Sequence, residues 1–324
     1  MGRCRAIDYH SAYAGVAECM QVNDAPVVVW GITDSHICLG QHQSLALEIN
    51  QNINVPVLRR PLGGGGVWLD EHQVCVVLVA PRSWFPSRPS AWYAHALAPL
   101  LQVCRDAGLR VELHEQDVAL HGAKLAGSGA ATIAQAGLVG SSFVLQFPAA
   151  AFAAAVATPS DGFRTWLEQA LRQNMTCWAE HTQVPDIDWL SMCYRRAAVM
   201  EYGWRWKQDV LRDDERTARE AWHEELQPDD LPIRKLVPYG IKVRAGCYLT
   251  EREWDGQRIR VLTKDGTIER LHLDNHPDIP ESILASSGTS VAVIGEQLLA
   301  WCFAEQAQTY AGRILATAWF GEEN

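Results

Sequence analysis

The sequence predicts an α/β (α+β) fold, in which a large mixed β-sheet flanked by helices is followed by a small α+β domain. Three observations support this prediction. Four early segments have strand-like, β-branched composition, and one of them, 73–80, is apolar almost throughout, as expected of a buried central strand. Helical patterns follow one another between residues 149 and 226. Beyond residue 233, two Asp-Gly pairs separate strand-like runs, which is the strongest short-range signal of a β-hairpin.

Local signals define the individual elements. A helix is predicted over about 91–107, because apolar residues recur at the helical period between Ser90 as N-cap and Gly108 as C-cap, and Pro99 favours a kink in it. The pair His121 and Gly122 marks the turn of a hairpin over 117–126. The other elements are expected as strands at 26–30, 37–39, 54–58, 73–80 and 142–147, helices at 149–157, 162–173, 189–202, 213–226 and 295–307, and hairpin turns at 255–256 and 265–266.

A polar, proline-bearing stretch at 227–233 predicts the boundary between two domains. We therefore divide the chain into a catalytic domain, 1–228, and an accessory domain, 229–324. Just before this boundary, the charges of 213–220 alternate in sign, which favours pairing between neighbouring turns of a helix. We expect this run to form a solvated helix face.

Composition and charge exclude several classes of protein. The net charge of −10 argues against nucleic acid as the main partner, since binding a phosphate backbone requires a positive field. No apolar run approaches the roughly 18 residues of a membrane span, and no secretory signal is recognisable, so we expect a cytoplasmic protein, and a monomer. The nine cysteines are scattered without a CxxC pair, which favours reduced, buried thiols over disulfides or structural zinc. No metal-binding spacing is found among His42, His72, His114 and His121.

The most informative run is the glycine-rich segment that follows Arg59 and Arg60. Its four consecutive glycines are Gly63, Gly64, Gly65 and Gly66, between two predicted strands. Without Cβ atoms, the backbone N–H groups of such a loop are free to converge on an anion, as in phosphate-binding loops. The arginines end the preceding strand, where a guanidinium meets phosphate or carboxylate well. A bare glycine run also occurs in flexible surface loops, so this alternative stays open.

A second run, 122–130, places one lysine, Lys124, among small and apolar residues. Its immediate neighbours carry no charge that would neutralise the ammonium group, and their small size lets the backbone approach a ligand closely. A lysine on a hairpin is more often simply solvated. The two runs together favour a functional interpretation.

The two runs resemble the signature of the lipoate–protein ligase family. That family's glycine motif reads roughly Arg-Arg-x-Ser-Gly-Gly-Gly-x-Val-x-His-Asp, and its lysine motif reads Lys-hydrophobic-small-Gly-Ser-Ala. The segment 39–43 with Glu48 and Asn50 is similar to the family's Gly-x-x-Gln…Glu-x-Asn stretch, and Gln116 and Asp117 stand where the family carries Asn-Asp. The resemblance covers about the first 230 residues, and the remainder looks like the accessory domain fused to many of these ligases.

The resemblance implies a two-step reaction. ATP and the carboxylate of lipoate or octanoate form an acyl-adenylate with loss of pyrophosphate, and a lysine of a carrier domain then attacks the mixed anhydride. It also implies a biotin/lipoate-ligase fold, a requirement for Mg²⁺, and a carrier partner. The candidate carriers are a glycine-cleavage H-like protein, a dehydrogenase lipoyl domain or a dedicated lipoate-binding protein of bacterial sulfur oxidation.

The family's site residues carry over onto this chain by motif. Lys124 would neutralise charge on the α-phosphate and the attacked carboxyl group, and Asp117 would hold Mg²⁺ or orient Lys124. Arg60 would bind carboxylate or phosphate. The adenylate would lie against Gly63, Gly64, Gly65, Gly66, Val67, Gly127, Ser128, Gly140 and Ser141. The acyl tail would occupy a dry slot lined by Trp30, Val67, Trp68 and Val76.

Departures from the family pattern leave alternatives. Leu62, Leu69 and Gln116 replace the family's serine, histidine and asparagine, which leaves room for a non-catalytic relative that binds acylated carriers. Octanoyltransferases share the fold but use a cysteine near the lysine motif. No cysteine lies at 108–123 or near 157–158, and Cys177 lies too far along the chain, so this route is disfavoured. Biotin–protein ligases, whose arginine-glycine loop differs in composition, rank third.

Overall fold

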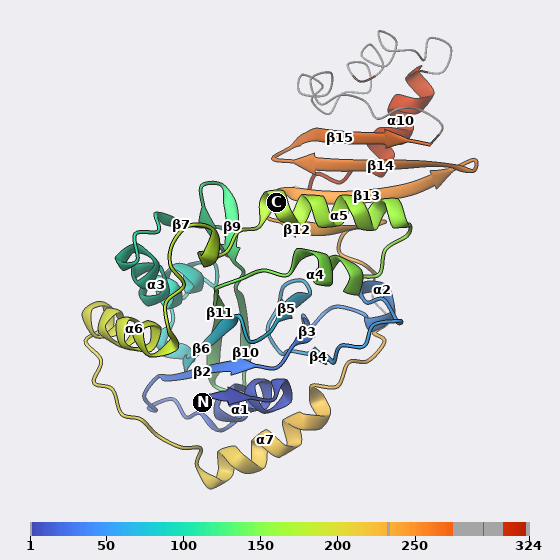
Figure 1. Cartoon of the computed structure of the whole chain (residues 1–324). Coiled ribbons are helices and arrows are strands. Elements are labelled where there is room, and N and C mark those ends of the chain that lie inside the picture. The colour runs from blue at the N-terminus through green and yellow to red at the C-terminus, as the bar shows by residue number, and fades with distance from the viewer. Residues whose placement is uncertain (1, 232–233, 275–293, 295–306, 322–324) are drawn as a thin grey trace. The chain divides into compact units, whose positions relative to one another are not determined.

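The computed structural model describes residues 2–231, 234–274, 294 and 307–321 (Figure 1). The chain forms two compact units. The first comprises Met1–Glu48, Asn52–Pro148 and Met175–Ile233, and the second comprises Ile49–Gln51, Ala149–Asn174 and Arg234–Asn324. The α/β class predicted from the sequence is confirmed. The division into a catalytic part, 1–228, and an accessory part, 229–324, stays a prediction about function.

A five-stranded mixed sheet forms the centre of the first unit. Its strand order is β1-β2-β6-β11-β10, with β1 parallel to β2 and the other pairs antiparallel. The central strand β6 is buried along its whole length, which confirms the expectation for 73–80. The strands are β1 (Arg3–Cys4), β2 (Val27–Thr33), β6 (Gln73–Pro81), β10 (Gly129–Ile133) and β11 (Ala136–Val144).

Alternate residues of β6 enter two different cores. Val74, Val76 and Leu78 face a core shared with α3 (Ala91–Asp106) and α6 (Ile187–Tyr202), whereas Cys75 and Val77 face a core shared with α1 (Ala6–Cys19). This alternation is the period of an extended strand. The predicted helix over about 91–107 is confirmed, and Pro99 lies inside it.

Two three-stranded sheets complete the first unit and carry the two motif runs. In one, the order is β4-β3-β5, and the glycine run connects β4 to β5. In the other, the order is β7-β8-β9, and Lys124 lies on β9. The strands are β3 (His36–Leu39), β4 (Val57–Arg59), β5 (Val67–Leu69), β7 (Val111–His114), β8 (Asp117–Leu120) and β9 (Ala123–Ala126), and the short helices are α2 (Leu45–Glu48), η1 (Arg82–Trp84) and η2 (Trp178–Glu180).

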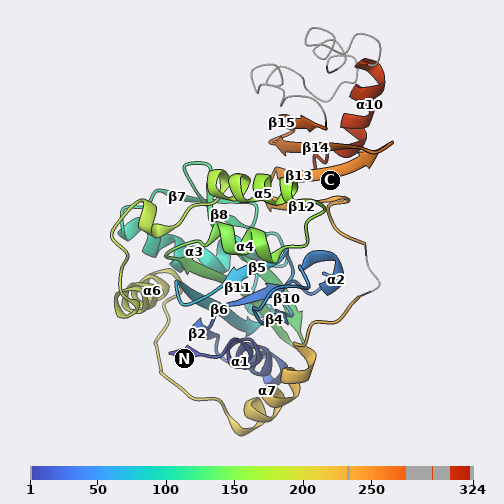
Figure 2. The same ribbon diagram turned by 45° about the vertical axis from the view of Figure 1, so that its right-hand side comes forward.

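The helix α7 (Asp213–Glu225) packs on α1, and both views show the two helices side by side (Figures 1 and 2). A Cβ atom at Gly15 would lie 2.8 Å from the backbone of Arg219, so the glycine permits this close approach. Glu215 is buried at 7% exposure, and Arg219 pairs with Asp8 of α1. The expectation that 213–220 is a solvated face was therefore wrong for one side of the helix, because charge alternation does not show which side a neighbouring helix covers.

The second unit consists of a four-stranded antiparallel sheet and three described helices. Left-handed backbone at Asp255, Gly256, Asp265 and Gly266 forms the two predicted hairpin turns. The helix expected at 295–307 lies outside the described residues, apart from Ala307, where α10 begins. The elements are α4 (Ala149–Ala155), α5 (Asp161–Asn174), β12 (Gly240–Arg244), β13 (Cys247–Trp254), β14 (Gln257–Lys264), β15 (Thr267–Leu273) and α10 (Ala307–Thr317).

A buried ion pair and a tryptophan connect α5 to this sheet. Arg260 of β14 donates to Glu251 of β13 at 2.6 Å, and its Nη2 lies 3.2 Å from the Ser160 hydroxyl just before α5. The Trp166 ring of α5 lies beneath two guanidinium groups, those of Arg260 and Arg270. Residues 149–174 therefore belong with the C-terminal sheet. Within the described residues, no helix is long and apolar enough to cross a membrane.

Candidate functional site

The glycine run forms a loop whose backbone carbonyl groups accept hydrogen bonds from the buried side chain of Arg60. The Arg60 guanidinium donates to the carbonyl oxygens of Cys38 at 2.7 Å, Gly63 at 2.9 Å and Gly65 at 2.7 Å. Arg60 is only 7% exposed, and Gly64 has a φ of +95°, which favours glycine. The planar fork of arginine can donate to two carbonyl groups of the turn and to one carbonyl of the neighbouring strand β3. Arg60 therefore shapes the loop, and its predicted contact with phosphate or carboxylate stays a prediction.

The loop also packs closely against two neighbouring segments. A Cβ atom at Gly40, just after β3, would overlap the carbonyl oxygen of Gly64. On the other side, the N–H of Gly63 donates to the carbonyl of Ala130 at 3.2 Å, and a Cβ atom at Gly129 would lie 2.8 Å from the oxygen of Gly63. A Cβ atom at Gly65 would meet nothing within 4 Å. Gly65 thus marks the side of the loop that faces open space.

Lys124 projects from a hairpin whose turn has left-handed backbone at His121 and Gly122, as predicted. Its ammonium Nζ lies 2.9 Å from Asp117 Oδ1, across the β8–β9 pair. The lysine side chain is 19% exposed and the aspartate side chain 9% exposed, so both are largely withdrawn from water. A Cβ atom at Gly127 would lie only 3.0 Å from Nζ. The ammonium group is therefore held between a carboxylate and bare backbone, and it is not the solvated lysine of the alternative interpretation.

The glycine loop and the lysine hairpin meet at one short segment, 127–130, which leads into β10. The glycine loop contacts its last two residues, Gly129 and Ala130, whereas the lysine contacts its first residue, Gly127. The two runs are separated by more than fifty residues in sequence. The structure therefore brings the proposed phosphate cradle and the lone ammonium group to the same edge of the fold.

Two predicted serines tie this segment to its surroundings. The Ser141 hydroxyl of β11 donates to the carbonyl of Gly127 at 2.9 Å, and the Ser128 hydroxyl donates to the carbonyl of Gln116. Gly140 lies against Leu62, since a Cβ atom at position 140 would lie 2.7 Å from Leu62 Cδ1. The leucine that replaces the family's serine is therefore matched by a glycine on the facing strand.

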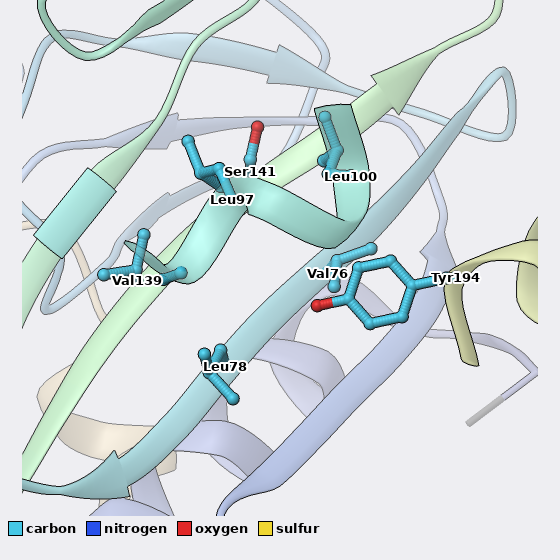
Figure 3. A pocket seen from close by; sticks show the side chains of 8 residues that line it. Val76, Leu78, Leu97, Leu100, Val139, Ser141 and Tyr194 are labelled. Atoms are coloured by element: carbon cyan, nitrogen blue, oxygen red, sulfur yellow. The ribbon is translucent and has the colours of Figure 1, made fainter. Parts of the chain in front are cut away.

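The predicted acyl slot is only partly assembled. Trp30 and Val76 are register partners on β2 and β6, and the Trp30 ring lies 5.6 Å from the Tyr194 ring of α6. Val76 and Tyr194 line a narrow cavity, with about 10 Å³ of free volume, roughly the room of a single water molecule (Figure 3). The remaining lining residues, which the sequence analysis missed except for Ser141, are Leu78, Ala96, Leu97, Leu100, Val139 and Ser141.

Trp68 and Val67 lie elsewhere. Both belong to β5 of a three-stranded sheet, where the Trp68 indole donates to Asp70 at 2.8 Å and Val67 packs on the core of α1. The structure does not bring them to the cavity of Val76. Strand alternation alone did not reveal which sheet each residue would join.

The cysteines give no support to a thiol mechanism among the residues that the structure describes. Cys177 lies nearer to the lysine than its sequence position suggested, because Met175 forms a bridge with Lys124. However, Cys177 is 4% exposed, and burial raises the pKa of its thiol, which opposes a reactive thiolate.

One group of possible metal ligands, His10, His36 and Cys38, escaped the sequence analysis. His10 is 26 residues from His36, whereas His36 and Cys38 are two residues apart on β3. This spacing matches no known metal-binding sequence motif. Among the described residues, the histidines considered from sequence take part in no such group.

The family of this chain is shown by sequence. The lipoyl protein ligase A/B catalytic domain matches residues 16–194, more than half of the chain. The chain belongs to this family. No curated protein matches it.

Solved structures of lipoate ligases have the same fold. A bipartite lipoate protein ligase of Thermoplasma acidophilum, studied with its E2 lipoyl domain, is similar over 69% of this chain and 90% of its own, with a TM-score of 0.64 and 16% identity. A lipoate-protein ligase A bound with ATP matches with a TM-score of 0.60 and 14% identity, over 69% of this chain and 92% of its own. The P. falciparum protein LipL1, in complex with lipoate, covers 97% of this chain and 98% of its own, with a TM-score of 0.53 and 11% identity.

Proposed function

We propose that this member of the lipoyl ligase family is an ATP-dependent lipoate–protein ligase. It activates the carboxylate of lipoate or octanoate to acyl-AMP and transfers the acyl group to a lysine of a carrier domain. One observation carries the proposal: Lys124 and the glycine loop contact the same four-residue segment, 127–130. A cation and a backbone cradle beside one another suit a linkage that joins a carboxyl group to a phosphate.

In the first step, a carboxylate oxygen attacks the α-phosphorus of ATP, and the bond to the β-phosphate breaks to release pyrophosphate. Negative charge builds up around the α-phosphate as this occurs. Lys124 is positioned for that charge before the reaction begins, because Asp117 fixes its ammonium group at 2.9 Å. The open side of the loop at Gly65 leaves room for the nucleotide. Gly63 contributes less than expected, since its N–H already donates to Ala130.

In the second step, the amine of the carrier lysine attacks the carbonyl carbon, and the bond from that carbon to the AMP oxygen breaks. Lys124 again stabilises the charge on the leaving phosphate. Asp117, whose Oδ1 pairs with Lys124, would be the residue that holds Mg²⁺ at this site, because Mg²⁺ beside nucleotides is commonly held by one or two carboxylates together with phosphates. Mg²⁺ would supply further neutralisation of the phosphate charge.

The acyl tail is proposed to enter the seam between β6 and α6. Val76 and Tyr194 line its cavity, and the buried Trp30 indole N–H beside it has no hydrogen-bond partner among the described residues. An unpartnered buried N–H is uncommon in a protein core, and the cavity shows that this seam is not completely packed. The cavity must widen to accept the tail, and Tyr194 has the largest side chain among the residues that line it.

Three neighbours support the choice of substrates and partner. Structures of similar fold are described with ATP, with lipoate and together with an E2 lipoyl domain. We infer that the present chain uses the same two small molecules and a lipoyl carrier. Acyl transfer measured in turn to a glycine-cleavage H-like protein, a dehydrogenase lipoyl domain and a dedicated lipoate-binding protein identifies the carrier that it serves.

The test is to incubate the protein with ATP, Mg²⁺ and lipoate, and to measure pyrophosphate release and acyl-AMP by mass spectrometry. Lys124→Ala is expected to lower the rate at least about 10²–10³-fold with the fold intact. Lys207→Ala, at an exposed lysine paired with Asp209, serves as the matched control and should be unchanged. Equal turnover of Lys124→Ala and wild type would refute the assigned role. Acyl transfer from an octanoyl carrier without ATP would instead favour the transferase, and carrier binding without either reaction would favour a non-catalytic relative.

A further inference from the structure

Three potential metal ligands lie together in the core between α1 and β3. The ligand atoms of His10, His36 and Cys38 are all within 4.8 Å of one another, and all three residues are buried. His36 and Cys38 are two residues apart on β3 and therefore point to the same face, whereas His10 comes from α1. None of the three was among the predicted residues of the nucleotide or acyl site.

A hydrogen-bond partner at Nδ1 fixes the orientation of each imidazole ring. The two Nε2 atoms face one another at 3.0 Å. On the far side of each ring, Nδ1 of His10 lies 3.0 Å from the Tyr13 hydroxyl, and Nδ1 of His36 lies 2.9 Å from the carbonyl of Asp34. Partners of this kind hold the rings of metal-binding histidines and fix which nitrogen is available to the ion. The inner nitrogens of both rings thus point to the place where Cys38 also lies.

The separation of the two imidazole nitrogens is close to that across a coordinated ion, and the Cys38 sulfur lies within 4.8 Å of both nitrogens. Two nitrogens bound to one tetrahedral ion at about 2.0–2.1 Å stand about 3.3 Å apart. The observed separation of 3.0 Å is only a few tenths of an ångström shorter. The two rings must turn so that both Nε2 atoms converge on one ion beside the Cys38 sulfur. Without an ion, the same geometry is a hydrogen bond from one Nε2–H to the other Nε2, which is the competing explanation.

The surrounding charge limits which ion fits. The Arg60 guanidinium donates to the Cys38 carbonyl at 2.7 Å, so its positive charge lies beside the three ligands. Arg60 therefore repels an added cation. A monovalent ion bound to one thiolate adds no net charge beside Arg60, whereas a divalent ion adds one positive charge. Imidazole and thiolate ligands select soft or borderline ions, such as Cu⁺ and Zn²⁺.

We propose that His10, His36 and Cys38 form a buried three-ligand site for a d¹⁰ transition-metal ion, with Cu⁺ favoured over Zn²⁺ by charge. The site is structural. It connects α1 to β3, and β3 lies beside the glycine loop through the Arg60 contact with Cys38 and the close approach of Gly40 to Gly64. A bound ion therefore stiffens the support of that loop.

The test uses the full-length protein, produced in cells supplied with zinc or with copper and then passed through a chelating buffer under reducing conditions. A buried ion exchanges slowly, so elemental analysis should find a single ion per chain in one of the two preparations. X-ray absorption at the edge of that metal should show two imidazole nitrogens and one sulfur. Retention of copper supports the proposed preference, whereas retention of zinc alone would overturn it. The metal-loaded protein should have a Tm at least about 5 °C above that of the metal-free protein.

Matched variants separate this site from the other thiols. His10→Gln and Cys38→Ser should lose the ion, whereas Cys75→Ser, at a neighbouring buried cysteine outside the three-ligand set, should retain it. Wild-type protein without bound metal from either preparation would overturn the proposal and leave the hydrogen-bonded histidine pair. Retention of the ion by Cys38→Ser would also overturn it. If the variants do not fold, the wild-type absorption spectrum decides, because a shell without sulfur or without imidazole contradicts the assignment.

Discussion

The glycine loop and the lysine hairpin reach the same segment, but the chain holds them by different means. The loop is a short connection between β4 and β5, and a buried side chain, Arg60, ties two of its carbonyl groups to a carbonyl of β3. The hairpin is supported by its own backbone pairing, and the ammonium group of Lys124 on β9 is held by Asp117 of the paired strand β8. Substitutions in the loop should therefore affect mainly stability, and substitutions in the hairpin mainly the reaction.

The largest effect is expected for Arg60→Ala. It removes donors from three carbonyl groups in a place that water reaches poorly, so we expect the free energy of unfolding to fall by about 3–5 kcal/mol. Arg60→Lys should restore little of it, because an ammonium group does not reproduce the planar fork. Urea unfolding followed by circular dichroism measures both. A loss under about 1 kcal/mol would show that the loop is held by its packing instead.

Gly40→Ala comes next. The added methyl group would overlap the carbonyl oxygen of Gly64, which is backbone and cannot rotate away, so a loss of about 2–4 kcal/mol is expected. Gly65→Ala is the matched control in the same loop, since its methyl group would meet nothing within 4 Å. It should change stability by less than about 1 kcal/mol. Equal losses for the two variants would contradict the packing described for the loop.

A substitution in the hairpin should separate reaction from stability. Gly127→Ala places a methyl group 3.0 Å from Lys124 Nζ, which is the flexible end of a side chain and can shift. We expect adenylate formation to slow about 10-fold or more through misplacement of the ammonium group, with stability changed by under about 1 kcal/mol. Gly122→Ala strains the turn but leaves Lys124 untouched, so it should cost about 1 kcal/mol without slowing the reaction. Pyrophosphate release and urea unfolding of both variants measure this contrast.

The smallest effect on stability is expected at Asp8, which lies outside both the glycine loop and the lysine hairpin. Hydrogen bonds from Arg5 and then Arg219 hold the pKa of Asp8 below its ordinary value. Because the pKa of Asp8 is lower in the folded state, the ionised carboxylate stabilises the fold at pH values above its ordinary pKa of 3.8. This stabilisation is lost as the pH falls from 3.8 through the pKa of the folded state. Asp8→Asn should therefore cost under about 1 kcal/mol at pH 7 and progressively less below pH 4. The test is to measure the urea midpoint of unfolding at pH 7 and below pH 4 for the wild type, Asp8→Asn and the exposed control Glu220→Gln. A cost that grows on acidification would reverse the assigned sign.

Local sequence signals predicted most of the elements because each depends on nearby residues. The Asp-Gly pairs at 255–256 and 265–266 adopt left-handed backbone in both hairpins, and the helix between Ser90 and Gly108 has the expected extent. The motif runs also predicted the two segments that meet at 127–130. The predicted acyl slot was less complete, since Trp30 and Val76 are register partners while Trp68 joined another sheet.

The sequence by itself determined the fold class, the hairpins and the family, because periodicity, turn chemistry and motif order are local properties of the chain. Tertiary structure decided which side chains became partners. It turned Arg60 toward the carbonyl groups of its own loop, paired Lys124 with Asp117, and brought His10 beside His36 and Cys38. Such contacts depend on how helices and sheets pack, and packing joins residues whose separation along the chain carries no information about their distance in space.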